Sequence, residues 1–325
     1  MRLGDYELGE VLGSGTFGQV YLARSHQRTV AVKVVSSRAG SLDKEFYVLG
    51  KMQGSKHFPN VYDYGSTESH YYMAMEPLGP SLKALLRSRN RPLSPHLWTK
   101  AWRQGLEALQ TLHRAGYLHR DIKPHNILLG KSNSDLYLID FGLAKAYCLA
   151  NGLIHAKVSE TNSVKGTYLF ASRSVVNFLA HSRRDDLESL VLSLLYLRNN
   201  GTLPWSGLKA CNDSELLGRI HREMNRVTVG ELCANAPREL YLTLEYVRGL
   251  KFEEEPDYAY LQSLVKTWSH QHRPVENFSS ASLGQFCDKL EQAREAETEE
   301  ATTKVSWTEI KLDERLKRKL SYYEA

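Results

Sequence analysis

The stretch "YLHRDIKPHNILLG", residues 117–130, decides the fold class of this chain. It places Asp121, Lys123 and Asn126 close together and follows them with an apolar run. Their spacing does not fit one face of a helix, so we predict a loop that aims a carboxylate, an ammonium and an amide at one point. These groups suit a metal-bound phosphate. An ordinary surface turn ahead of a strand at 126–129 is the alternative when the stretch is taken alone.

The composition indicates an ordinary globular protein. The chain has 325 residues, of which 42% are hydrophobic and 24% charged, so it can bury a substantial core. Its net charge is +5, although residues 288–325 carry ten acidic and eight basic side chains. A mildly basic body suits an anionic small ligand or an acidic protein surface. Nucleic-acid binding would call for denser Lys and Arg clusters, so we expect no nucleic-acid partner.

The four cysteines, Cys148, Cys211, Cys233 and Cys287, are scattered without a CxxC pair. We expect reduced thiols and no zinc site. The sequence "MRLGDYELGE" has no apolar core of a signal peptide, and no stretch reaches about 18 apolar residues. We therefore expect a protein of the cytoplasm or the nucleus, without a membrane partner. We also expect a monomer.

Hydrophobic periodicity divides the chain into two kinds of structure. The first third alternates apolar and polar residues around Gly-rich turns, as an antiparallel meander does. Residues 41–54 change to helical spacing, with Ser41 or Asp43 as the expected cap and Gly54 as the stop.

After Gly79, helical patterns dominate. They cover residues 97–116, 185–197, 236–250 and 257–271, and the second of these is apolar nearly all round after an Asp-Asp cap, which predicts a buried helix. In the tail, Ser306 and Glu309 form a predicted capping box before a leucine stripe that could dock on the body or on a partner helix. We expect an α+β chain with a sheet lobe at 1–78, a mainly helical lobe at 79–287 and a charged helical tail at 288–325.

A glycine motif and two charged residues add a phosphate-binding pattern. "LGSGTFGQVYLA" holds Gly13, Gly15 and Gly18 between two predicted strands, whereas the dinucleotide fingerprint requires a strand that runs into a helix. Lys33 follows on the next strand and Glu45 on the predicted helix. A strand lysine is usually a surface residue, but a Lys-Glu pair can hold the lysine against α- and β-phosphates.

Asp140, in "LIDFGLAK", ends an apolar strand and is followed by Phe141 and Gly142. It could simply precede a turn. Near Asn126, however, it would be the second oxygen ligand that Mg²⁺ between phosphates requires.

The order of these motifs resembles that of the eukaryotic protein kinases. Five further stretches, "HSRRDDLESL", "GTLPWSGLKA", "LGPSL", "KMQG" and "EPDYAYL", resemble the casein kinase 1 family over roughly residues 3–275. Like that family, the chain lacks an Ala-Pro-Glu tripeptide after the activation segment. The resemblance implies a bilobal fold and a Ser/Thr protein kinase that uses ATP and Mg²⁺ on protein substrates.

The resemblance also implies residue roles. Asp121 would be the catalytic base and Lys123 would steady the γ-phosphate, while Thr167 would bond both and favour Ser/Thr acceptors. Asn126 and Asp140 would hold Mg²⁺. The positions implied for ATP are Leu12, Gly13, Gly15, Gly18, Val20, Ala31, Lys33, Glu45, Met75 as gatekeeper, Glu76, Leu78 and Asp140. Asp186 resembles the aspartate that braces the catalytic loop, or else it is an ordinary helix cap.

Two departures from the family concern substrate recognition. The arginine that reads a phosphate already on the substrate is replaced by Leu169, and "CNDSELLGR" replaces a basic run. We therefore expect weakened recognition of phosphate-primed substrates. Acidic substrates are expected from the mildly basic body of the chain. Arg120, Lys145 and Lys165 could form a second anion pocket, although Lys145 and Lys165 also fit a solvated surface. Residues 172–174 read Ser-Arg-Ser, where the family has Ser-Ile-Asn.

Two other functions stay open from the residues alone. The chain could be a catalytically silent scaffold with this fold, but none of the motif residues is missing. A small-molecule phosphotransferase would share the phosphate machinery, without the Gly-Thr pair or "RRDDLES". Phosphate transfer to a protein substrate is the observation that separates them.

Overall fold

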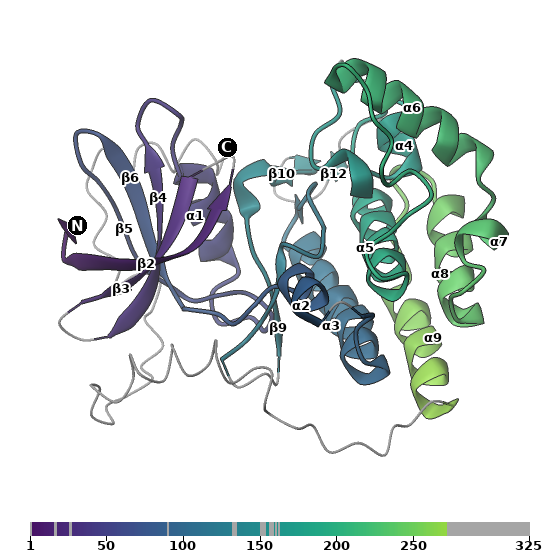
Figure 1. Cartoon of the computed structure of the whole chain (residues 1–325), viewed down its shortest axis with the longest axis horizontal. Helices are drawn as coiled ribbons and strands as arrows, with labels where there is room; N and C mark the ends of the chain where they lie inside the picture. Colours follow the sequence, from purple (N-terminus) through teal and green to yellow (C-terminus); the bar gives the residue numbers. More distant parts are fainter. Residues whose placement is uncertain are drawn as a thin grey trace. The chain divides into compact units, whose positions relative to one another are not determined.

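The computed structural model describes residues 2–271, except 16–17, 26–27, 90, 132–134, 150–153, 156–158, 160 and 162. The chain forms two compact units. The first contains residues up to Pro80 together with Leu129–Gly142, and the second contains Ser81–Leu128 and the described residues from Leu143 onward (Figure 1). The predicted α+β fold class, with an antiparallel sheet and a mainly helical part, is confirmed. The predicted tail at 288–325 and Cys287 lie outside the described residues.

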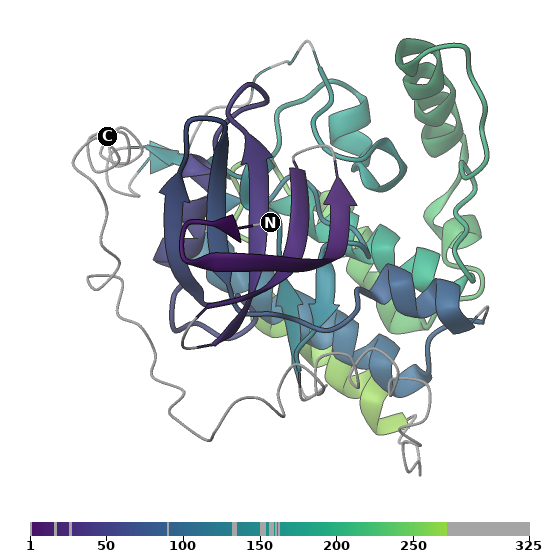
Figure 2. The same cartoon turned by 60° about the vertical axis from the view of Figure 1, so that its left-hand side comes forward.

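The first unit is built on a six-stranded antiparallel sheet in the order β1-β2-β3-β4-β6-β5 (Figure 2). The strands are β1 (Arg2–Leu3), β2 (Tyr6–Gly15), β3 (Gly18–Arg24), β4 (Thr29–Ser36), β5 (Val61–Ser66) and β6 (His70–Met75). Val30, Val32 and Ala74 are fully buried on β4 and β6. The alternation of apolar and polar residues thus produces a meander with a buried face, as predicted.

One helix, α1 (Asp43–Lys51), belongs to this unit. The expected cap at Ser41 or Asp43 is wrong: the N-cap is Leu42, and no side chain caps it. The Asp43 carboxylate instead accepts a hydrogen bond from the Tyr64 hydroxyl of β5. A carboxylate in the first helical turn is still favourable for the helix dipole. The helix ends at Lys51, with Met52 as its C-cap, and Gly54 two residues later has a φ of 77°.

The segment 129–142 joins the first unit through two hydrogen bonds to one loop residue, His57. The Leu138 N–H donates to the His57 carbonyl (2.8 Å), and His57 Nδ1 bonds the Leu136 carbonyl (2.8 Å). This segment contains β9 (Leu136–Leu138) and the start of the 3₁₀ helix η1 (Phe141–Leu143). Phe141 is fully buried near Phe58, with ring centroids 5.9 Å apart. Asp140 is thereby fixed to the sheet unit, although 107 residues separate it from Lys33.

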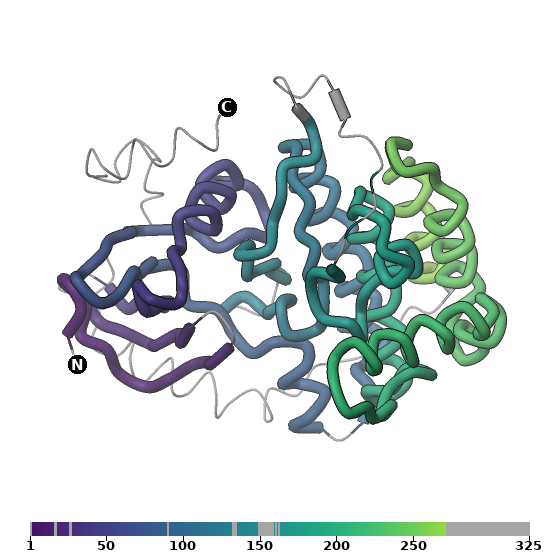
Figure 3. The backbone as a smooth tube through the Cα atoms, turned by 90° about the horizontal axis from the view of Figure 1, so that it is seen from above, coloured from purple at the N-terminus to yellow at the C-terminus, as the bar shows by residue number. Residues whose placement is uncertain are grey.

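The second unit is a helical assembly in which α3 (Pro95–Arg114) packs against α5 (Arg183–Arg198) and α9 (Tyr258–Gln271) (Figure 3). Trp98, Trp102 and Leu192 lie in its core. The prediction of a buried helix after residue 184 is confirmed, since nearly every residue of α5 from Asp185 to Leu197 is buried. Its predicted Asp-Asp cap is misplaced: Ser182 is the N-cap, and Asp185 Oδ2 accepts from the Ser182 N–H (2.6 Å).

The remaining elements complete the second unit. They are α2 (Leu82–Arg89), β7 (Tyr117–Leu118), β8 (Ile127–Leu129), β10 (Lys145–Ala146), β11 (Cys148–Leu149), β12 (Ile154–His155), η2 (Tyr168–Phe170), α4 (Arg173–Val176), α6 (Asp213–Arg226), α7 (Val229–Leu232) and α8 (Arg238–Gly249). Helix α6 begins at the side-chain cap Asn212, in the stretch that replaces the expected basic run. Among the helices that the structure describes, none combines the length and apolar character needed to cross a bilayer.

Candidate active site

The glycine motif lies where β2 turns into β3. Gly18 has a φ of 129°, and a Cβ there would lie 2.2 Å from the Val34 carbonyl oxygen, so only glycine fits. A Cβ on Gly13 or Gly15 would meet no atom within 4 Å. Packing therefore explains Gly18, whereas the space beside Gly13 and Gly15 leaves their backbone open to a ligand. Leu12 and Val20 flank these glycines and are half-buried.

Lys33 is a buried, doubly paired lysine rather than a surface residue. Its Nζ lies 2.5 Å from Glu45 Oε2 and 3.0 Å from Asp140 Oδ1, and its side chain is 10% exposed. Burial by itself would lower the pKa of Lys33, but the carboxylates of Glu45 and Asp140 raise it above its ordinary value. The ammonium is therefore kept charged. Asp140 takes this position with a φ of 68°, a left-handed conformation that non-glycine residues rarely adopt.

The segment after β6 supplies the residues predicted to meet adenine. Met75 is buried and pairs in register with Ala31 of β4 and Val61 of β5. The Glu76 N–H donates to the Asn60 carbonyl (2.8 Å), and the Glu76 carboxylate accepts from the Asn60 N–H and side-chain amide. Among the described residues, the Leu78 N–H has no backbone acceptor. That N–H could bond a flat heterocycle.

The second unit gathers three side chains around Asp121. Asp121 Oδ1 accepts from the Thr167 N–H and the Thr167 hydroxyl, both at 2.9 Å. Asp121 Oδ2 accepts from Lys123 Nζ (2.6 Å) and, more weakly, from Asn126 Nδ2 (3.3 Å). Lys123 Nζ also donates to Thr167 Oγ1 (2.9 Å). The structure thus brings together the four residues that the resemblance implied for catalysis, with the carboxylate buried and its orientation fixed.

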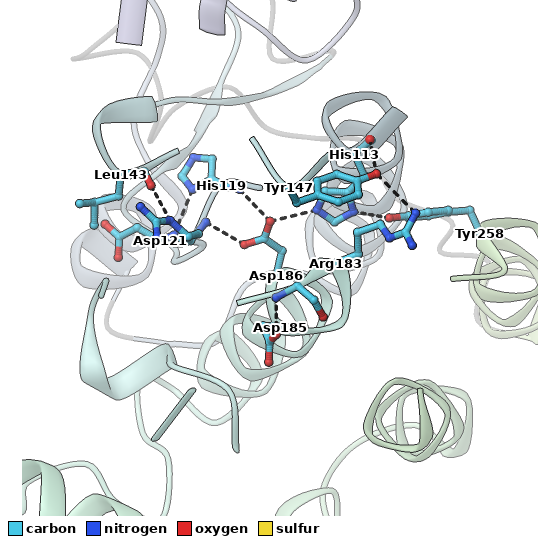
Figure 4. Close-up of polar contacts among 11 residues, drawn as sticks. His113, His119, Asp121, Leu143, Tyr147, Arg183, Asp185, Asp186 and Tyr258 are labelled. Atoms are coloured by element: carbon cyan, nitrogen blue, oxygen red, sulfur yellow. Dashed lines mark hydrogen bonds and ion pairs between the residues drawn. The ribbon is translucent and has the colours of Figure 1, made fainter. Parts of the chain in front are cut away.

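Asp186 anchors the backbone of this loop from α5. Its carboxylate accepts from the N–H groups of His119 and Arg120, both at 2.8 Å, and from His113 Nε2 at 2.9 Å (Figure 4). Burial would raise the pKa of Asp186, but the hydrogen bond and charge of His113, with His119, lower it below its ordinary value. Asp186 therefore stays ionised. Its role is to brace the loop, and the simple cap reading is wrong.

His113 is a site residue that the sequence motifs do not predict. This fully buried histidine at the end of α3 bonds Asp186 through Nε2 and the Tyr258 hydroxyl of α9 through Nδ1 (Figure 4). Its carbonyl accepts from the Tyr147 hydroxyl (2.7 Å). Three helices therefore meet at one side chain. In the sequence, His113 is simply a histidine in an amphipathic helix. Many core histidines share this pattern without connecting three helices.

Gly166 is the glycine of the Gly-Thr pair, and its backbone geometry explains why a glycine stands there. Its φ is 91°, and a Cβ would lie 2.4 Å from the Arg120 carbonyl oxygen. Only glycine lets the chain pass this close and deliver the Thr167 N–H to Asp121. Arg120 itself has a φ of 66°, so the backbone on both sides of this approach takes left-handed values.

Asn126 and Asp140 carry oxygen atoms of the kind that Mg²⁺ prefers. Both hydrogen bonds of Asn126 to Asp121 use the amide nitrogen, so its amide oxygen is the atom suited to a hard cation. In the other unit, Lys33 bonds Oδ1 of Asp140. Each residue therefore fits its predicted role within its own unit.

Comparison with known proteins identifies the family. A family model described as "Protein kinase domain" matches residues 6–236. The chain belongs to the protein kinase family. This kinase chain is also 36% identical over 267 residues to Casein kinase I homolog 2 of Schizosaccharomyces pombe, an alignment that covers 80% of this chain and 61% of that relative. It thus spans about three fifths of the relative's length. The two matches confirm the resemblance identified from the motifs.

Proposed function

We propose that this chain is an active Ser/Thr protein kinase that transfers the γ-phosphate of ATP to hydroxyl groups of protein substrates. The observation that carries the proposal is the Asp121 carboxylate, fixed by the Thr167 N–H and hydroxyl and bonded to Lys123. A carboxylate with this many donors keeps its direction, as a base that orients a substrate hydroxyl must. The kinase family match agrees with this reading.

The chain's own groups supply positioning and charge. Lys33, held by Glu45 and Asp140, is the cation for the α- and β-phosphates of ATP, and the open backbone at Gly13 and Gly15 allows close approach of phosphate oxygens. Lys123 is the cation for the γ-phosphate beside the base. Mg²⁺, when held by Asn126 and Asp140, would neutralise the phosphate charge. Such preorganised charges supply most of the rate in phosphoryl transfer.

We also propose that phosphate-primed recognition is weak and that acidic substrates are preferred. The position expected to hold an arginine is Leu169, and its carbonyl accepts from the Trp205 indole (2.8 Å). The basic run is replaced by the first turn of α6, which carries Asp213 and Glu215. Two carboxylates in place of cations repel a phosphate. The net charge of +5 still favours acidic surfaces.

Phosphate transfer from labelled Mg-ATP tests the activity directly. We expect the full chain to phosphorylate casein and acidic Ser/Thr peptides and Asp121→Asn to lose at least about 99% of this rate. A wild-type protein that binds ATP yet phosphorylates no acceptor would contradict the proposal and favour the scaffold function. Matched peptides with and without an upstream phosphoserine test priming, and a strong preference for the phosphorylated form would refute the second proposal.

We further propose that the protein acts as a monomer in the cytoplasm or the nucleus, without nucleic-acid or membrane partners. Light scattering of the purified chain measures the oligomeric state, and fluorescence imaging of a tagged form measures the location.

A further inference from the structure

Helix α2 carries an arrangement of charges that its own stability does not explain. Its sequence, "LKALLRSR", contains three cations and no carboxylate. Lys83 lies in the first turn, where the helix dipole favours an acid and disfavours a cation. Lys83 and Arg87 are four residues apart and so share one face, a spacing at which like charges repel. Arg87 and Arg89 lie in the last turn, where the helix dipole stabilises a cation. The cation that the dipole destabilises is therefore Lys83.

The first turn of α2 lies beside the loop that carries the base. The Lys83 N–H donates to the Pro124 carbonyl (3.1 Å), between Lys123 and His125. The His125 side chain, next in sequence to Pro124, is exposed. Burial and the nearby charge of Arg87 lower the pKa of the Lys83 ammonium. The cations of α2 therefore lie together beside the loop that contains Asp121 and Lys123.

Packing holds Lys83 toward the substrate-positioning segment. Its ammonium bonds the Tyr196 hydroxyl and lies 4.4 Å from the centre of that ring. The Tyr196 ring meets Phe170 edge to face at 5.2 Å, and the Phe170 N–H donates to the Thr167 carbonyl (2.9 Å). Thr167 in turn bonds Asp121. Lys83 is thus connected to the base by a second route, independent of Pro124.

We propose that Lys83 and Arg87, with the exposed imidazole of His125 as a hydrogen-bond donor beside them, form a cationic subsite, the α2 cluster, that binds an anionic side chain of the protein substrate beside the acceptor hydroxyl. The inference rests on the proposed kinase function and locates its acidic preference. An anion at this subsite relieves the repulsion between the cations. The carboxylate of an acidic residue and a phosphorylated residue share this chemistry.

The α2 cluster also accounts for acidic preference in a chain that lacks the expected phosphate reader. Leu169 and the acidic first turn of α6 stand where the family's phosphate-reading cations are expected. The cations of α2 lie on a different element of the same unit. The peptide residue that binds at the α2 cluster would therefore differ in its position, relative to the acceptor hydroxyl, from the residue that carries a priming phosphate.

The test measures kcat/KM of the full chain on one neutral Ser peptide and on variants with Asp, phosphoserine or Lys at each flanking position. For the wild type we expect at least one position where an anion raises kcat/KM about tenfold over the neutral peptide, more than one exposed ion pair gives. In Arg87→Glu this gain in kcat/KM should disappear, and a Lys at the same position of the peptide should raise kcat/KM instead. Lys83→Met keeps the stem over Tyr196 and should reduce the gain.

The control is Arg238→Glu, the same change of charge at an exposed arginine in the first turn of α8, which should leave the wild-type preferences unchanged. A gain confined to phosphoserine identifies a phosphorylated residue as the ligand, and a gain with Asp as well identifies acidic residues. An anion gain that persists in both Arg87→Glu and Lys83→Met refutes the subsite while leaving the kinase function intact. A wild type that phosphorylates none of the peptides refutes the kinase function itself.

Discussion

The hydroxyl of Thr167 gives the sharpest test of how the base is held. It donates to Asp121 Oδ1 and accepts from Lys123 Nζ, both at 2.9 Å. In Thr167→Val both bonds disappear, while the backbone N–H of residue 167 can still bond Asp121. Hydrogen bonds to charged groups contribute about 1.5–3 kcal/mol each, and the remaining contacts compensate in part. We expect a loss of about 3 kcal/mol in transition-state stabilisation, or on the order of a hundredfold in kcat.

The assay is steady-state phosphorylation of one Ser peptide with saturating Mg-ATP. Thr167→Ser is the matched control, because it keeps the hydroxyl and loses only a methyl group, and we expect it to retain kcat within about threefold. The KM for ATP should change little in both variants, since the hydroxyl contacts the base and not the pair formed by Lys33 and Glu45. If Thr167→Val turns over as fast as Thr167→Ser, the hydroxyl does not position Asp121 and our account of the site is wrong.

Three other predictions concern backbone, charge and pH. Gly166→Ala places a Cβ 2.4 Å from a carbonyl oxygen at a φ of 91°, so kcat should fall more than about a hundredfold while thermal unfolding shows the protein still folded; near-normal activity would contradict this. Glu45→Gln leaves Lys33 with one carboxylate, so the KM for ATP should rise about tenfold, whereas Glu107→Gln, in an exposed pair on α3, should not change it. Burial lowers the pKa of His181 to about 4, and its Nε2 is buried without a hydrogen-bond partner among the described residues. The folded state therefore favours the neutral ring, and stability should be complete above about pH 6.5 and fall by up to about 3 kcal/mol as the pH decreases towards 4. Urea unfolding across this range should show a flatter dependence for His181→Gln, and an unchanged slope would exclude His181 as the cause.

Local sequence patterns predicted the helices and strands well where the apolar residues serve only to bury one or more faces of the element. The alternation at the start of β2 and the nearly continuous apolar sequence of α5 each follow from the faces that the element buries. The caps were less predictable. Asp43 and Asp186 both look like capping residues, but their carboxylates accept hydrogen bonds from residues far along the chain. Asp43 accepts from the Tyr64 hydroxyl, and Asp186 accepts from the backbone N–H groups of residues 119–120. A helix start can be read from sequence only when its polar side chain has no better partner elsewhere.

The sequence by itself determined the order of the motifs, the α+β class and the identity of the charged groups, because these depend on residue type and short spacing. Only the tertiary structure decided which groups meet: Thr167 reaches Asp121 across 46 positions, and Lys33 meets Asp140 across 107. The roles of His113 and Gly166 likewise depend on where α9 and the Arg120 carbonyl lie. The physical reason is that hydrogen bonds act over about 3 Å, so a partner far along the chain is fixed by packing and backbone geometry, which no local pattern encodes.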